Sequence, residues 1–302
     1  MDKNDIAIIK SKRKSELIGK SYTTACGMLI IILTLSIFFF IASKGVATFT
    51  TDHVSIFDFL FSSTWAPEKI GSRGQPYVGA AIFIAGSIIV SIFAVLVSTP
   101  ISICSAVFMT EISPKLGEKF LRPAIELFAG IPSVVYGWIG LSILVPFLRN
   151  TVGGLGFSLL AAGIVLTIMI FPTIASVAAD SLRVLPSDYR EAAYALGATR
   201  WQTIKGVLIP AALPQIFTGV VLGMARAFGE ALAVQMVIGN SIKFPQGLTD
   251  PTITLTSIIT MDMGNTVAGS AWNNALWSMA LLLLLISFGF IILIRRISKR
   301  GD

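Results

Sequence analysis

Six long apolar segments separated by polar stretches dominate the hydrophobic pattern of the chain. Each carries almost no charge and is long enough for a helix of about 20 residues, the length that crosses a hydrocarbon core. The second and fifth exceed that length, so we expect them to tilt or to extend beyond the bilayer. The pattern predicts an all-α integral membrane protein with six transmembrane helices, over residues 22–43, 78–109, 124–148, 157–179, 212–238 and 274–294.

The overall composition agrees with this fold class. Apolar residues make up 54% of the 302 residues and charged residues 13%, about half the charged share of a soluble domain. We therefore expect one transmembrane domain over residues 21–302, preceded by a cytoplasmic basic segment over residues 1–20. The first apolar segment lacks a convincing small-residue cleavage site, so we expect it to remain as a membrane anchor.

Lysine and arginine are distributed unequally between the two faces of the predicted bundle. Of the 23, 17 lie in the N-terminal segment, the C-terminal tail and the loops after the second and fourth spans, whereas five lie in the other loops. The remaining one, Arg226, is inside a span. This asymmetry predicts that both termini are cytoplasmic. Topology then explains the net charge of +7, and we expect lipid rather than nucleic acid around the chain.

Few residues could support enzymatic chemistry or metal binding. Cys26 and Cys104, the two cysteines, lie in apolar segments, and the single histidine, His53, lies in a polar loop. We therefore expect no disulfide, no metal site and no catalytic residues. The sequence also lacks the Gly-x-x-x-x-Gly-Lys-Ser/Thr phosphate loop. If the protein works with ATP, we expect ATP and Mg²⁺ to bind to a partner ATPase and no cofactor to bind to this chain.

The predicted cytoplasmic loop over residues 181–211 has the pattern of two short helices separated by a glycine. Ser187 is expected to cap the first helix, and Gly197 to end it in the left-handed conformation. Tyr189, Ala193 and Leu196 fall on one face at helical spacing. Taken alone, this periodicity fits an amphipathic hairpin that lies against the lipid headgroups as well as it fits a docking surface.

The order of residues in this loop resembles the EAA motif of ABC importer permeases. Glu191–Ala193 reads Glu-Ala-Ala, Gly197 follows after three residues, and Val207–Pro210 follows after nine more. The family pattern ends in Ile-x-Leu-Pro, so Val and Ile replace Ile and Leu here. The resemblance implies the type I ABC importer permease (MetI-like) fold and a coupling loop that seats on a dimeric ATP-binding subunit. The residues that it places in this contact are Glu191, Ala192, Ala193, Leu196 and Gly197.

Two charged residues interrupt the fifth predicted span. Arg226 and Glu230 are four residues apart, so a continuous helix would place them on one face. A charge near the bilayer centre costs about 2.5–3.5 kcal/mol, whereas such a pair returns only about 0.2–0.5 kcal/mol. We expect both to face the bundle interior or a water-filled path, as an anion site or as an ion pair that fixes the helix register. Ser133 and Tyr136 of the third span either add hydroxyls to this path or pack against the backbone.

Further stretches resemble the C-type permease of phosphate importers. These are Met109–Pro114, Glu126–Trp138 and Arg226–Val234, and the resemblance extends from about residue 27 to 296. It implies phosphate as the solute, a homologous A-type permease as heterodimer partner, an extracytoplasmic phosphate-binding protein, and a place in the bacterial cytoplasmic (inner) membrane. On this basis we expect Arg226 to attract the oxyanion and Glu230 to accept a hydrogen bond from protonated phosphate.

Other functions remain open from the sequence. A permease for sulfate, molybdate or phosphonate would share the coupling loop. An ion-gradient-driven carrier would show internal repeats and more intramembrane acids, and a membrane enzyme would show a cluster of polar catalytic groups; neither pattern is seen. The two outer loops, near residues 44–77 and 239–273, are either ordered connections or a small cap with a docking surface.

Overall fold

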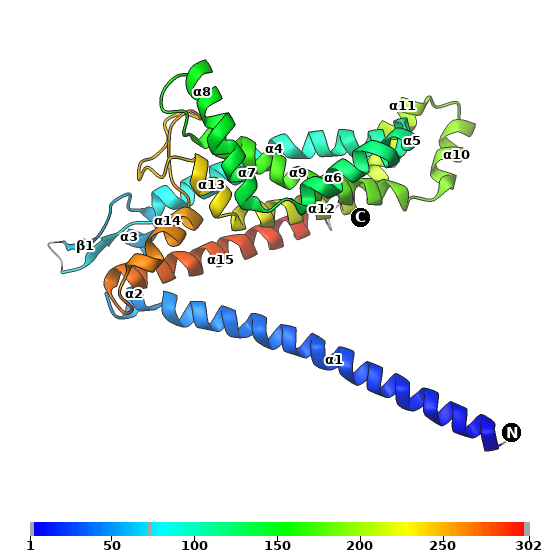
Figure 1. Cartoon of the computed structure of the whole chain (residues 1–302), viewed down its shortest axis with the longest axis horizontal. Helices are drawn as coiled ribbons and strands as arrows, with labels where there is room; N and C mark the ends of the chain where they lie inside the picture. Colours follow the sequence, from blue (N-terminus) through cyan, green and yellow to red (C-terminus); the bar gives the residue numbers. More distant parts are fainter. Residues whose placement is uncertain (1–2, 72–73, 299–302) are drawn as a thin grey trace.

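The computed structural model describes residues 3–71 and 74–298, which form a helical bundle with one small β-hairpin (Figure 1). The predicted number of membrane spans, six, is confirmed in this part of the chain. Three cations used to predict the orientation, Arg73, Lys299 and Arg300, lie outside the described residues. Within the described part, the helical stretches long and apolar enough to cross a membrane are Glu16–Thr50, Ala81–Ile112, Ser133–Thr151, Leu159–Arg183, Arg200–Gly229 and Ala271–Ile292.

The centre of the bundle is formed by helices α4 (Ala81–Val107) and α9 (Leu159–Arg183). Small residues let their backbones approach closely, which is the usual basis of helix packing in membranes. A Cβ at Gly163 would lie 2.3 Å from Cδ1 of Phe93, and Ala94 is fully buried. Helix α4 continues into the π-helical turn η1 (Phe108–Ile112).

The third predicted span is not one helix, and that prediction is wrong in its first part. Helix α6 (Arg122–Gly130) ends before Pro132, and α7 (Ser133–Ile139) begins directly after it, with Ile131 and Pro132 in extended conformations. Proline lacks a backbone N–H and disfavours helix at the residue before it. The span then continues through η3 (Gly140–Leu144) and α8 (Val145–Thr151).

The fifth predicted span also breaks, although the sequence predicted a continuous helix to residue 238. It runs through α11 (Arg200–Thr203), the π-helical turn η4 (Ile204–Leu208) and α12 (Ile209–Gly229), and then stops. Glu230 is extended, with ψ at 123°, and a separate short helix, α13 (Leu232–Val237), follows. The break divides the apolar segment next to its charged residues.

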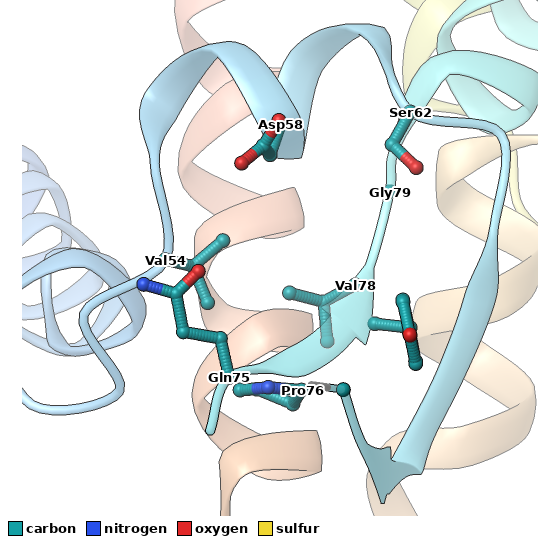
Figure 2. Close-up of a pocket in the computed structure, with 9 residues that line it drawn as sticks. Val54, Asp58, Ser62, Gln75, Pro76, Val78 and Gly79 are labelled. Carbon is teal, nitrogen blue, oxygen red and sulfur yellow. The ribbon is translucent and has the colours of Figure 1, made fainter. Parts of the chain in front are cut away.

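The end of the bundle away from the two termini carries the hairpin and several short helices (Figure 1). Strands β1 (Trp65–Ile70) and β2 (Pro76–Val78) pair antiparallel, and α3 (Ile56–Phe61) lies beside them around a cavity of about 330 Å³. Figure 2 shows Asp58 and Ser62 on one side of it and Val78 on the hairpin. All of its lining residues belong to this end of the bundle, so the cavity is separate from the charged region of α12.

The remaining elements complete the bundle at its two ends. Helix α1 (Lys3–Gly45) meets α15 (Ala271–Ser298) near Gly45, where an added Cβ would lie 2.8 Å from Leu281, and then diverges from the bundle (Figure 1). The others are α2 (Ala47–Thr50), α5 (Pro114–Leu116), η2 (Gly117–Leu121), α10 (Ser187–Ala195), α14 (Leu255–Asp262) and η5 (Met263–Asn265).

Candidate substrate site and coupling loop

Arg226 lies in the last turn of α12, half-buried between core residues. Its Nη1 donates a hydrogen bond of 3.2 Å to the hydroxyl of Thr173 on α9. A guanidinium group carries five N–H donors in a planar fork. Among the described residues, the bond to Thr173 is the one hydrogen bond made with the Arg226 guanidinium. The other N–H donors of Arg226 are therefore available to a ligand with several oxygens. The hydrogen bond to Thr173 fixes the orientation of the guanidinium group.

Glu230 occupies the break after α12, so its predicted place on the same helical face as Arg226 is wrong. One carboxylate oxygen, Oε1, accepts a hydrogen bond of 3.1 Å from the N–H of Ala233 in the first turn of α13. Its backbone carbonyl accepts another of 2.8 Å from the hydroxyl of Thr256 on α14. The described salt bridges do not include one between Arg226 and Glu230.

Tyr136 and Ser133 come from the first turns of α7, directly after the Pro132 break. The Tyr136 hydroxyl donates a hydrogen bond of 2.6 Å to the carbonyl of Phe128 in α6, so it ties the two sides of the break together. The phenol also lies within electrostatic range of Arg226. Ser133 is half-buried at the start of α7. The structure thus gathers two helix breaks around one arginine.

Thr173 is a site residue that sequence reasoning missed. It follows Pro172 within α9, in a helix otherwise rich in small and apolar residues. A lone threonine in an apolar helix usually bonds its own backbone, so its sequence context carries little signal. The proline one residue earlier is the feature that could have drawn attention to this turn.

The coupling loop forms two helices, α10 and α11, joined through Gly197 at φ +80°, which confirms the predicted left-handed glycine. The predicted Ser187 cap is wrong, because Pro186 is the N-cap residue and Ser187 is the first helical residue. The second helix is capped instead by Thr199, whose side chain and that of Gln202 form a reciprocal capping box. Such caps satisfy N–H groups that a short helix leaves unpaired.

The surface of this loop differs in part from the prediction. Ala193 is 7% exposed, whereas Tyr189 is 45% and Leu196 is 90% exposed, so the three do not share one environment. Leu196 lies beyond the last residue of α10, as its C-cap, and therefore leaves the helical face. The surface offered to solvent includes Glu191, Ala192, Leu196 and Gly197, together with two aromatic residues that the motif did not indicate, Tyr194 and Trp201.

Comparison with known protein families agrees with this arrangement. Residues 98–301 match the family described as binding-protein-dependent transport system inner membrane component. The chain belongs to this family. It is therefore a transporter permease subunit, and membership of this family implies a binding protein and an ATPase as partners. The resemblance noted in the sequence is confirmed at the level of the importer permeases.

Several curated relatives of this permease cover most of its length. It is 51% identical to the probable ABC transporter permease protein YqgH of Bacillus subtilis, over 96% of this chain and 93% of that protein. It is 34% identical to the phosphate transport system permease protein PstC of Xylella fastidiosa, over 78% of this chain and 77% of that protein. The probable PstC protein of Methanocaldococcus jannaschii is 33% identical, over 85% and 84%.

Solved importer permeases share the fold of this chain at low identity. A chain of a bacterial alginate ABC transporter, crystallised with an alginate-bound periplasmic protein, aligns with a TM-score of 0.63 at 15% identity, over 94% of this permease and 96% of that chain. A chain of the MetNI methionine ABC transporter aligns with a TM-score of 0.55 at 21% identity, over 72% and 92%. These likenesses confirm the predicted type I importer permease fold.

Proposed function

We propose that this permease is one half of the translocation path of an ATP-driven importer of inorganic phosphate. The observation that carries the proposal is Arg226, a half-buried cation with free donors inside a membrane span, in a chain 32–35% identical to phosphate permeases. Burying a cation in a span is expensive unless it meets a counter-ion or a path for one. Phosphate supplies that counter-ion transiently.

In this proposal the two charged residues have different roles. Arg226 presents its planar fork to the phosphate oxygens, in the manner typical of arginine at oxyanion sites. Thr173 holds one Nη and so orients the rest of the group. Glu230 uses Oε1 to hold α13, and its second oxygen accepts a hydrogen bond from a protonated phosphate oxygen. The same carboxylate repels fully ionised sulfate, which has no proton to donate.

The two helix breaks support a path completed by a second, A-type permease. Backbone groups freed by a break cannot be satisfied by lipid, so irregular backbone at membrane depth is covered by protein or lines water. Pro132 is exposed and Ser133 half-exposed on the surface of this single chain. A heterodimer with a homologous permease covers this face and places the break against the shared path.

The same proposal assigns a direction in the membrane. The coupling loop, the N-terminal end of α1 and the C-terminal end of α15 lie toward the same end of the bundle (Figure 1). An ATPase binds in the cytoplasm, so both termini are cytoplasmic, the protein lies in the bacterial inner membrane, and the hairpin end faces the binding protein. ATP and Mg²⁺ are bound by the ATPase subunit, and this chain carries no cofactor of its own.

Transport by the reconstituted complex tests the function directly. The chain is assembled in vesicles with its ATPase, second permease and binding protein, and ATP-dependent uptake of labelled phosphate is measured with sulfate as competitor. We expect uptake that a large excess of sulfate leaves nearly unchanged. Equal inhibition by sulfate would assign the chain to another oxyanion, and uptake without ATP would contradict the importer mechanism.

A further inference from the structure

The cytoplasmic end of the second span contains a buried acid that the transport path does not use. Glu111 lies in η1, and its side chain is 9% exposed. A carboxylate removed from water is strongly destabilising unless it is paired and hydrogen-bonded. The partner of Glu111 therefore identifies the segment that is bound to this turn.

The partner of Glu111 is Arg190 of the coupling helix α10, 79 residues further along the chain. The two side chains form a bidentate pair, with Nη2 2.5 Å from Oε1 and Nε 3.2 Å from Oε2. Arg190 also donates to the carbonyls of Leu182, at 3.3 Å, and Leu185, at 3.4 Å, near the end of α9. The hydrogen bonds that Arg190 donates to the Glu111 carboxylate raise the pKa of its guanidinium, which stays charged.

A second arginine fastens the other half of the coupling loop to the same turn. Nη2 of Arg200, at the start of α11, donates a hydrogen bond of 3.1 Å to the carbonyl of Ile112 in η1. The two contacts lie on opposite sides of Gly197. Both helices of the coupling loop are thus joined to the last turn of the second span.

Arg190 and Arg200 connect the coupling loop to a different span from the one that the backbone of α10 packs against. The backbone of α10 packs on η4, which belongs to the fifth span, whereas α4 packs on α9 and α12. A force on the coupling loop therefore reaches the fifth span along the chain itself. It reaches the second span directly through Arg190 and Arg200, and indirectly through the packing of α4 on α12.

We propose that Glu111 and Arg190 form the joint through which the coupling loop moves the second span. This rests on the proposed function only in taking the loop as the docking site of the ATPase. Movement of α4 shifts the surface that packs against α9 and α12, the helices that hold Thr173 and Arg226. The pair is a positioning device: it touches neither solute nor nucleotide, and it couples the ATPase cycle to the path.

The first test is the ratio of uptake to ATP hydrolysis in the reconstituted complex. In Glu111→Gln and Arg190→Gln, we expect that ratio to fall about tenfold, within the range of roughly 5–150-fold that typical coupling free energies produce. The ATPase still copurifies and hydrolyses ATP. The charge-swapped chain, Glu111→Arg with Arg190→Glu, recovers part of the ratio. Arg122→Gln is the matched control, because it breaks ion pairs on the same surface whose side chains are 45–65% exposed, and such pairs contribute little.

The second test follows the joint without reference to the solute. The exposed Cys26 and Cys104 are replaced by Ser, and Ile112→Cys, at a site 47% exposed, is labelled with a maleimide with and without nucleotide. We expect nucleotide to change the labelling rate several-fold with Arg190 present and not in Arg190→Gln. Leu196→Cys, on the docking surface, stays protected by the ATPase in both backgrounds.

The outcomes separate the joint from the proposed function. An unchanged uptake-to-hydrolysis ratio together with nucleotide-dependent labelling in Arg190→Gln overturns the joint. Loss of ATPase copurification in the variants also overturns it, because the pair would then only hold the loop in shape. If the wild-type complex fails to take up phosphate while nucleotide still changes labelling only with Arg190 present, the phosphate proposal fails and the joint stands.

Discussion

Two of the arginine–glutamate combinations among the described residues behave in opposite ways. Arg226 and Glu230 are four residues apart in the sequence, yet the helix ends between them and their side chains bond to other groups. Glu111 and Arg190 are 79 residues apart, yet they form a bidentate ion pair between η1 and α10. Proximity in the sequence thus left open an ion pair that does not form, and it gave no sign of the pair that does.

The two arginines differ in how many of their N–H donors are already used within the protein. Arg190 uses donors on all three guanidinium nitrogens, on one carboxylate and two carbonyls. Arg226 has one described hydrogen bond, to a neutral hydroxyl. An arginine with satisfied donors holds structure in place, whereas one with open donors can bind and release an anion.

The largest expected effect is at the open arginine. Arg226→Gln removes the charge that meets the oxyanion, and we expect phosphate uptake to fall about 100-fold, since losing a desolvated charge contact costs about 2–5 kcal/mol. Labelled phosphate uptake at equal amounts of protein in the membrane measures it. Arg226→Lys keeps the charge without the fork and should fall in between. Uptake at the wild-type rate in Arg226→Gln would contradict the comparison.

Breaking the Glu111–Arg190 pair should lower the free energy of unfolding. Removing one partner of a buried pair costs about 3–5 kcal/mol, and we expect about 2 kcal/mol for Glu111→Gln, because Arg190 is 26% exposed and solvent screens the pair. Thermal unfolding of the purified complex gives the value. In a double-mutant cycle with Arg190→Gln, the double variant should lose less than the sum of the singles; strict additivity would show that the two do not interact.

A smaller effect is expected from removing the hydrogen bond that orients Arg226. Thr173→Val keeps the shape of the side chain but removes the acceptor for Arg226, and a hydrogen bond to a charged group contributes about 1.5–3 kcal/mol. We expect KM for phosphate to rise about tenfold with kcat little changed. Thr173→Ser retains the hydroxyl and serves as the control. An equal loss in both variants would show that packing, not the hydrogen bond, is what matters.

The smallest effect concerns the turn between the two coupling helices. Gly197 has φ +80° and open space around an added Cβ, so Gly197→Ala strains the backbone alone, by about 1–2 kcal/mol. We expect ATP-driven uptake to fall about fivefold, with basal ATP hydrolysis retained. Gly197→Asn, which tolerates the left-handed region better, should lie closer to wild type. The reverse order would assign the effect to the side chain rather than to the backbone.

The spans were predictable from the sequence because length and apolarity alone decide whether a segment can cross a bilayer. The breaks were not, since Pro132 and Glu230 each interrupt a segment that remains apolar on both sides. The left-handed Gly197 was predicted because glycine has a specific conformational reason to end a helix.

The candidate site was predicted in composition and only partly in geometry. Arg226 stood out because a cation in an apolar segment is rare, and the placement of Glu230 failed because a continuous helix was assumed. Thr173 and the Glu111–Arg190 pair depend on contacts between distant segments. A pattern along one chain carries no information on such contacts.

The π-helical turn η4 has a consequence for the spacing between the coupling loop and the path. It lies between α11 and α12, and a π turn amounts to one residue inserted into an α-helix. Because the wider turn absorbs this residue, α11 and α12 keep nearly the angular phase of an uninterrupted helix. Rewinding Ile204–Leu208 as regular α-helix with all five residues retained would rotate everything before it by about 100° relative to Arg226. The angular phase between the coupling loop and the path is therefore set by how this one turn is wound.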